Sequence, residues 1–134
     1  MSNWLLRIAT LYLAAGVTLG IAMAASHNHV EAPLHAHLNL LGFVTLTLAA
    51  LWYRAQPEAS DTTLAKMHFV LHNLGLPVMS GGLFFLLRGE PAAEPVVAIG
   101  STVVAAGIAC FVVNLWRCTG HRKSTLDALA TALR

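Results

Sequence analysis

The stretch HAHLNLLGFVTLTLAALWYR, residues 35–54, opens with two histidines and continues as an apolar run. A transmembrane helix needs about 20 predominantly apolar residues, and this stretch has that length. Ionisable side chains inside such a helix are rare, and each one is a candidate functional residue. The stretch therefore predicts a membrane-spanning helix that carries a functional pair, His35 and His37, near one end.

The whole chain has the composition of a membrane protein. It has 134 residues, of which 57% are hydrophobic and only 10% charged, against about 25% charged in a soluble domain. Four stretches are long and apolar enough to span a bilayer, at residues 4–25, 34–53, 64–87 and 96–116, followed by a short tail at 117–134. We expect one all-α domain, an integral membrane four-helix bundle with no removable signal peptide.

Lys and Arg residues are unevenly distributed between the two sets of span ends. Only Arg88 lies on one side, and the other side carries Arg7, Arg54, Lys66, Arg117, Arg122, Lys123 and Arg134. The positive-inside rule then places both termini and the middle loop in the cytoplasm, which indicates the inner membrane of a bacterium. The same interface would hold the amphipathic aromatic residues Trp4, Trp52, Tyr53 and Trp116.

Two other features narrow the range of functions. The net charge of +2 is small and no basic cluster is interleaved with aromatic residues, so no nucleic-acid partner is expected. Cys110 and Cys118 are too few for a disulfide framework, and no CxxCH segment is present for covalent haem attachment. We expect both to be free thiols.

Small residues predict where helices approach closely. Gly16 and Gly20 form a Gly-xxx-Gly pattern in the first span, which allows close packing of a neighbouring helix. The third span contains GLPVMSGG, in which Pro77 interrupts the helical hydrogen bonds and the glycines leave room for a neighbour or a flat ligand.

The spacing of the histidines predicts how they can act. His35 and His37 are two residues apart, so on a regular helix they point about 200° apart and cannot share one metal ion, but they could serve two sites. His68 and His72 are four apart, so they share a helix face and could chelate one ion, as paired helical histidines do in zinc sites. His68 could instead reach the lipid headgroups at the cytoplasmic interface.

A neutral imidazole is the commonest metal ligand of proteins. We take His35, His37 and His72 as candidate haem ligands and, with His68, as candidate metal ligands. Counted from the outer ends of their spans, His37 and His72 differ in depth by about 15 to 18 Å at 1.5 Å per residue. One iron between these two residues of the same chain is therefore not expected, which favours ligands from different subunits.

The segments HAHLNLLGFVTLTLAALWYR and KMHFVLHNLGLPVMSGG resemble a membrane segment of the haem-copper oxidase and nitric oxide reductase large subunits, the family of cytochrome c oxidase subunit I. In that family twelve helices form three arcs of four, and the second helix of the last arc carries an HxH pair that binds two haems on opposite faces. The resemblance covers one arc and matches this pair to His35 and His37. It implies a homotrimer that rebuilds the twelve-helix ring.

The resemblance implies haem b at subunit interfaces, serving electron transfer with a redox partner or binding of a diatomic gas. The chain lacks the adjacent His-His copper pair of the family and a counterpart of its catalytic tyrosine, so oxidoreductase activity is left open and no residue is assigned as catalytic. Two alternatives remain. One is a copper- or zinc-binding membrane protein that uses the outer histidines with Met23, and the other is a cofactor-free structural or assembly protein.

Overall fold

The computed structural model describes the backbone of residues 1–132 and the side chains of residues 1–119. Within this part the chain is helical, without strands, and its elements are α1 (Ser2–Ser26), α2 (Ala32–His37), η1 (Leu38–Thr45), α3 (Leu46–Ala55), α4 (Pro57–Ser60), α5 (Thr63–Leu87), η2 (Pro91–Ala93) and α6 (Glu94–Ala132). The side chains of the predicted tail from residue 120 onward, with His121, lie outside the described residues.

Four helices are long and apolar enough to cross a membrane, at Ser2–Ser26, Ala32–Ala55, Thr63–Leu87 and Pro91–Thr119. The second of these is one continuous rod made of α2, η1 and α3. The prediction of an all-α fold with four helices long and apolar enough to span a membrane is confirmed for the described residues. Each expected span falls inside one of the observed helices.

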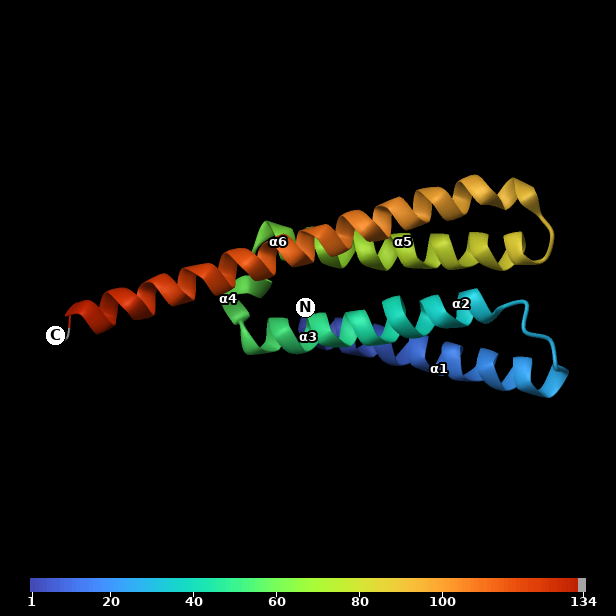
Figure 1. Ribbon diagram of the computed structural model, residues 1–134, viewed down its shortest axis with the longest axis horizontal. Coiled ribbons are helices and arrows are strands. Elements are labelled where there is room, and N and C mark those ends of the chain that lie inside the picture. Colours follow the sequence, from blue (N-terminus) through green and yellow to red (C-terminus); the bar gives the residue numbers. More distant parts are fainter. Residues whose placement is uncertain (133–134) are drawn as a thin grey trace.

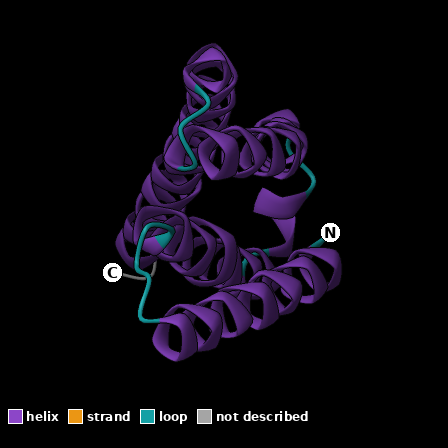
Figure 2. Cartoon of the chain, turned by 90° about the vertical axis from the view of Figure 1, so that its right-hand side faces the viewer, coloured by secondary structure: helices purple, strands orange, loops and turns teal. Residues whose placement is uncertain are grey.

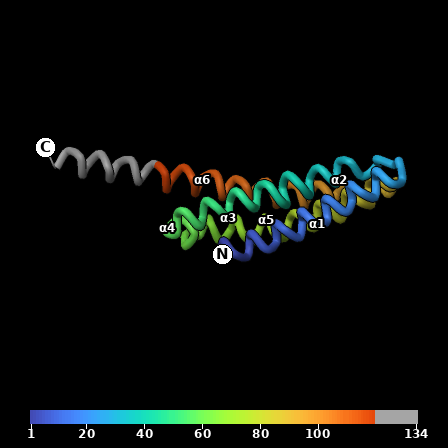
Figure 3. The backbone as a smooth tube through the Cα atoms, turned by 90° about the horizontal axis from the view of Figure 1, so that it is seen from below, coloured from blue at the N-terminus to red at the C-terminus, as the bar shows by residue number. Residues whose placement is uncertain are grey.

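The helices pair into two hairpins. Helix α1 packs against the α2–η1–α3 rod, and α5 packs along α6 (Figure 1). The short helix α4 joins the two hairpins at one end of the bundle (Figure 1), and Arg88 lies just after α5 at the opposite end. We call these the α4 end and the Arg88 end. Figure 2 looks along the helices from the Arg88 end, and Figure 3 shows from another side that the bundle is elongated.

Individual residues in the connectors explain where the helices end and begin. Helix α1 stops at His27, whose φ of 53° is left-handed. Helices α2 and α4 both begin with proline in their first turn, where the missing N–H costs no hydrogen bond. Helix α5 begins after Thr62, whose hydroxyl accepts a hydrogen bond from the N–H of Ala65 at 3.1 Å.

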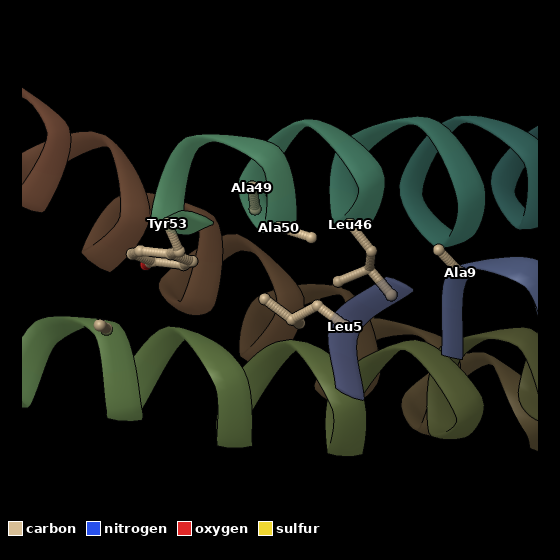
Figure 4. Packing of buried hydrophobic residues seen from close by; sticks show 7 residues of the cluster. Leu5, Ala9, Leu46, Ala49, Ala50 and Tyr53 are labelled. Carbon is tan, nitrogen blue, oxygen red and sulfur yellow. The ribbon is translucent and has the colours of Figure 1, made fainter. Parts of the chain in front are cut away.

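The core at the α4 end is built from small side chains around a few large ones. Figure 4 shows Leu5 of α1 reaching towards Leu46 and Ala50 of α3, with Tyr53 further along the rod. Tyr53 is only 1% exposed, so its ring faces the core of the bundle and not the lipid. It packs against the rings of His68 of α5 and Phe111 of α6.

Helices α5 and α6 approach each other through glycines. A Cβ added to Gly100 would lie 2.4 Å from the backbone nitrogen of Met79, and one added to Gly75 would lie 2.7 Å from that of Val104. Gly82 packs in the same way against Val97. Gly75 and Gly82 of the third span, expected to make room for a neighbour, therefore make room for α6 of the same chain.

An ion pair links the two hairpins at the Arg88 end. The guanidinium of Arg88 donates two hydrogen bonds to one oxygen of Glu31, at 3.1 and 2.9 Å, and lies over the ring of Phe84 at 3.8 Å. Glu31 precedes α2, and Arg88 follows α5. The pair therefore joins the loop of one hairpin to the loop of the other.

Candidate functional site

His37 is a half-buried candidate ligand whose only hydrogen-bond partner among the described side chains and backbone is the carbonyl of Pro33. Its Nδ1–H donates a hydrogen bond of 2.7 Å to the carbonyl of Pro33, one turn earlier in the same rod. This bond fixes the tautomer, so that Nε2 carries a free lone pair. A metal-bound histidine almost always donates its other N–H in this way. His37 therefore has the tautomer and the anchored ring of a ligand.

His35 lies against α1 of its own chain. Its Nδ1–H donates to the carbonyl of Gly16 at 2.9 Å, and its Nε2 lies 3.2 Å from the amide nitrogen of Asn39, which can donate to it. The ring packs beside Gly20, where an added Cβ would lie 3.0 Å from its Cε1. The Gly-xxx-Gly pattern thus accommodates polar side chains of the second span.

The two histidines of the HAH motif have different surroundings, as their spacing predicts. Both nitrogens of His35 have partners inside the chain, whereas only Nδ1 of His37 has one, so the prediction of a ligand facing another subunit is kept for His37. Asn39 is one turn after His35, so helical spacing could have predicted their contact.

His68 and His72 form a buried pair between the hairpins. Both side chains are 0% exposed, and their rings lie edge to face with centroids 5.4 Å apart. The expectation that His68 reaches the lipid headgroups is wrong, because its side chain is fully buried against Tyr53 and Phe111. His68 shares a hydrogen bond of 3.2 Å between its Nδ1 and the hydroxyl of Tyr53, and Phe111 of α6 flanks the ring.

Each ring of this pair retains one nitrogen without a partner. His72 donates its Nε2–H to the carbonyl of Leu41 at 3.1 Å, which leaves Nδ1 as a buried lone pair. Nε2 of His68 is likewise buried without a partner. Buried polar atoms without partners are rare in native proteins and call for an explanation. The pair is therefore a second candidate site.

The contact of His72 with Leu41 changes the expected depth of these residues. Leu41 is four residues after His37, so His72 bonds to the rod about 6 Å below His37 rather than about 15 Å or more. The estimate from span ends fails because the loop after α1 turns back along the bundle before α2 begins (Figure 1).

Leu41 belongs to η1, a π-helical segment of eight residues in the middle of the rod. Such segments are rare and are frequent at functional sites, since they rearrange carbonyls that a regular helix would use internally. Here one carbonyl accepts from His72, and that of Leu40 accepts from the hydroxyl of Thr45 at 2.8 Å. No pattern of side chains in the sequence signals this segment.

The remaining candidates do not gather into a site. His27 and His29 are exposed at the Arg88 end, whereas Met23 is 7% exposed within α1. Among the residues whose side chains are described, no three His, Cys, Asp or Glu residues converge where they could hold a metal ion. Cys110 and Cys118 are free thiols, as expected.

Haem needs both a ligand and space for its ring. Two open grooves of about 370 and 660 Å³ lie on the bundle, and no histidine lines either of them. His72 lines neither groove, and neither does His37, whose Nδ1 is held by the carbonyl of Pro33.

No protein-family model, no curated protein and no solved structure matches this chain.

Proposed function

We propose that this chain is a membrane haem b protein in which His37 is an axial ligand, with the haem held between copies of the chain. The observation that carries the proposal is the 2.7 Å hydrogen bond from Nδ1–H of His37 to the carbonyl of Pro33. It holds the ring in one orientation and leaves Nε2 free to coordinate iron. When bound, haem b supplies one-electron transfer or, with an open axial position, binding of a diatomic gas.

The chain's own residues hold and orient the ligand. The carbonyl of Pro33 sets the tautomer of His37, and the proline sits in the first turn of α2, where its ring fixes the backbone. The contact of His35 with Gly16 fixes the rod against α1. His37 is thus presented from a helix pair that is tied together one turn away, which limits its freedom to move.

The proposal extends to the assembly and its location. The resemblance of HAH to the paired haem ligands of the oxidase family supports three copies arranged in a ring, since closed cyclic symmetry repeats the same pocket at each interface. The distribution of Lys and Arg supports an inner bacterial membrane with both termini in the cytoplasm. A redox partner would exchange electrons with the haem, and no catalytic residue is assigned.

Purified protein tests this proposal. Full-length chain expressed with ample haem and extracted in detergent is expected to show the Soret and α bands of haem b and a trimeric mass. His37→Ala should abolish the bands, whereas His29→Ala, which removes an exposed histidine from the same end, should leave them unchanged. A carbon monoxide difference spectrum then separates gas binding from electron transfer, because two histidine ligands leave no open position.

The opposite results are equally clear. A folded, colourless wild-type protein would refute the haem proposal and favour the structural or assembly role. Equal haem content in wild type and His37→Ala would refute the assignment of the ligand. A folded monomer that carries haem would refute its location between copies.

The buried pair favours a second candidate function, the binding of one copper or zinc ion per chain. His68 and His72 share a helix face, and each retains an unpartnered nitrogen while its other nitrogen is held by Tyr53 or Leu41. Imidazole suits both metals. Metal analysis of haem-free protein is expected to give one ion per chain, lost in His68→Ala and in His72→Gln. Unchanged metal content in these variants, when folded, would exclude the site.

A further inference from the structure

A groove on the outside of the second hairpin is not used by either proposed site. It has a volume of about 660 Å³ and lies at the Arg88 end, where it is lined by residues of α5, by the short η2 helix and by the start of α6. Its lining includes Val78, Gly81 and Phe85 of α5, and Glu90 before η2, and these residues determine which ligand can bind there. We call this the α5–η2 groove.

The floor of the groove exists because one glycine is left open. Gly82 packs against Val97 of α6, so it serves the contact between the helices. A Cβ added to its neighbour Gly81 would meet nothing within 4 Å. The walls are apolar, and the volume lies in the range of about 300 to 1,000 Å³ typical of small-molecule sites.

The position of the groove sets the shape of its ligand. Gly81 lies six residues before the end of α5, which corresponds to about 9 Å along the helix, and Glu90 lies just beyond that end. In a bilayer the floor would be at the depth of hydrocarbon and the mouth at the depth of the headgroups. A matching ligand is apolar at one end and polar at the other.

The charge at the mouth of the groove determines which polar group the ligand carries. Among residues 1–119 the carboxylate of Glu90 makes no ion pair and no hydrogen bond, and Arg88 is the single Lys or Arg at this end of the bundle. Arg88 is already bound to Glu31 and stacked on Phe84. A second copy of these residues would therefore bring no spare Lys or Arg to Glu90, so the complementary charge must come from elsewhere.

We propose that the α5–η2 groove binds a phospholipid with a primary ammonium headgroup, of the phosphatidylethanolamine class. Its ammonium group pairs with Glu90, and its acyl chain lies over Gly81. The proposal shares no residue with the haem or metal sites, so it stands or falls independently of them.

Native mass spectrometry of the full-length protein in detergent, titrated with phosphatidylethanolamine, phosphatidylcholine or phosphatidylglycerol, tests the proposal. Wild type is expected to retain phosphatidylethanolamine most strongly. Glu90→Gln should weaken the binding of phosphatidylethanolamine about fivefold and abolish the preference for it over phosphatidylcholine. Glu94→Gln makes the same change of charge outside the groove and should have neither effect. Gly81→Phe should fill the groove and reduce retention of every lipid, whereas Leu74→Phe, on the exposed face of α5, should not.

Two results would overturn the proposal. One is equal retention of the three lipids by wild type, or a preference that survives both Glu90→Gln and Gly81→Phe. The other is a change of oligomeric mass in Gly81→Phe with lipid retention unaffected, which would place a second copy of the chain in the groove.

Discussion

The closest approach between α5 and α6 gives a quantitative test of the fold. Gly100→Ala adds a Cβ that would lie 2.4 Å from the backbone nitrogen of Met79, 2.6 Å from its Cα and 2.8 Å from its Cβ. Ordinary contact begins at 3.4 Å, so the shortfall is 3.4 minus 2.4, or 1.0 Å. The atoms in the way belong to the backbone, and no side-chain rotation can relieve the clash. The two helices must separate.

The cost of this separation can be bounded. A gap of 0.5 to 1 Å forfeits about a quarter to a half of each dispersion contact, and overpacking of a close-packed site costs about 1–3 kcal/mol. We therefore expect Gly100→Ala to lower the free energy of unfolding by about 1–3 kcal/mol. Gly81→Ala is the matched control, because the same change there meets no atom within 4 Å and should cost nothing.

Reversible unfolding in mixed micelles of rising SDS content, followed by far-ultraviolet circular dichroism, measures both variants against wild type. The reasoning predicts a large difference between two substitutions that are chemically identical. Equal unfolding free energies for Gly100→Ala and Gly81→Ala would refute it, and would mean that α5 and α6 do not meet at Gly100.

Three further predictions concern polar contacts, and the same titration measures each. Tyr53→Phe leaves both nitrogens of the buried His68 ring unpartnered, so the free energy of unfolding should fall by about 1–3 kcal/mol; an unchanged value would contradict the contact. Asn114→Leu removes a buried amide that donates a hydrogen bond of 2.9 Å to the backbone of α4, so a similar fall in the free energy of unfolding is expected. Proteolysis of the α4 connector should also be faster than in wild type. Equal cleavage rates would argue that Asn114 does not hold α4 in place. Arg88→Gln breaks the exposed pair with Glu31 and should cost less than about 1 kcal/mol, an effect that added salt removes from wild type; a larger, salt-independent loss would indicate a buried pair.

The four spans could be predicted because their determinant is local. Twenty or so apolar residues bounded by Pro and charge suffice to mark a membrane helix, and the short connectors force neighbouring spans to run antiparallel. The different surroundings of His35 and His37 followed from helical period alone. These features depend on residues close together in the sequence.

The burial of Tyr53 and His68 could not be predicted in this way. Both lie near span ends, where aromatic and polar side chains ordinarily face the interface. Their burial depends on their contact with each other across the two hairpins and on Phe111 of α6, which packs against both rings. That arrangement is set by contacts distant in sequence.

The relation between His37 and His72 was missed for a related reason. Depth counted from span ends assumes that all spans begin at the same level, whereas the chain after α1 runs back along the bundle before α2 starts. The π-helical segment also lies within this stretch, and it alters the register of the rod without a signature in side-chain polarity.

The division into two hairpins has a consequence for biogenesis. Both buried imidazoles, His68 and His72, belong to the second hairpin, whereas their partners Tyr53 and Leu41 belong to the first. Lipid is as apolar as leucine, so burial of apolar surface gives the hairpins little reason to associate inside a bilayer, and polar bonds between them supply specificity. During synthesis the first hairpin is complete before the second is translated. Docking of the second hairpin then gives each of its two buried imidazoles one hydrogen-bond partner, so these two bonds favour the correctly paired arrangement of the hairpins.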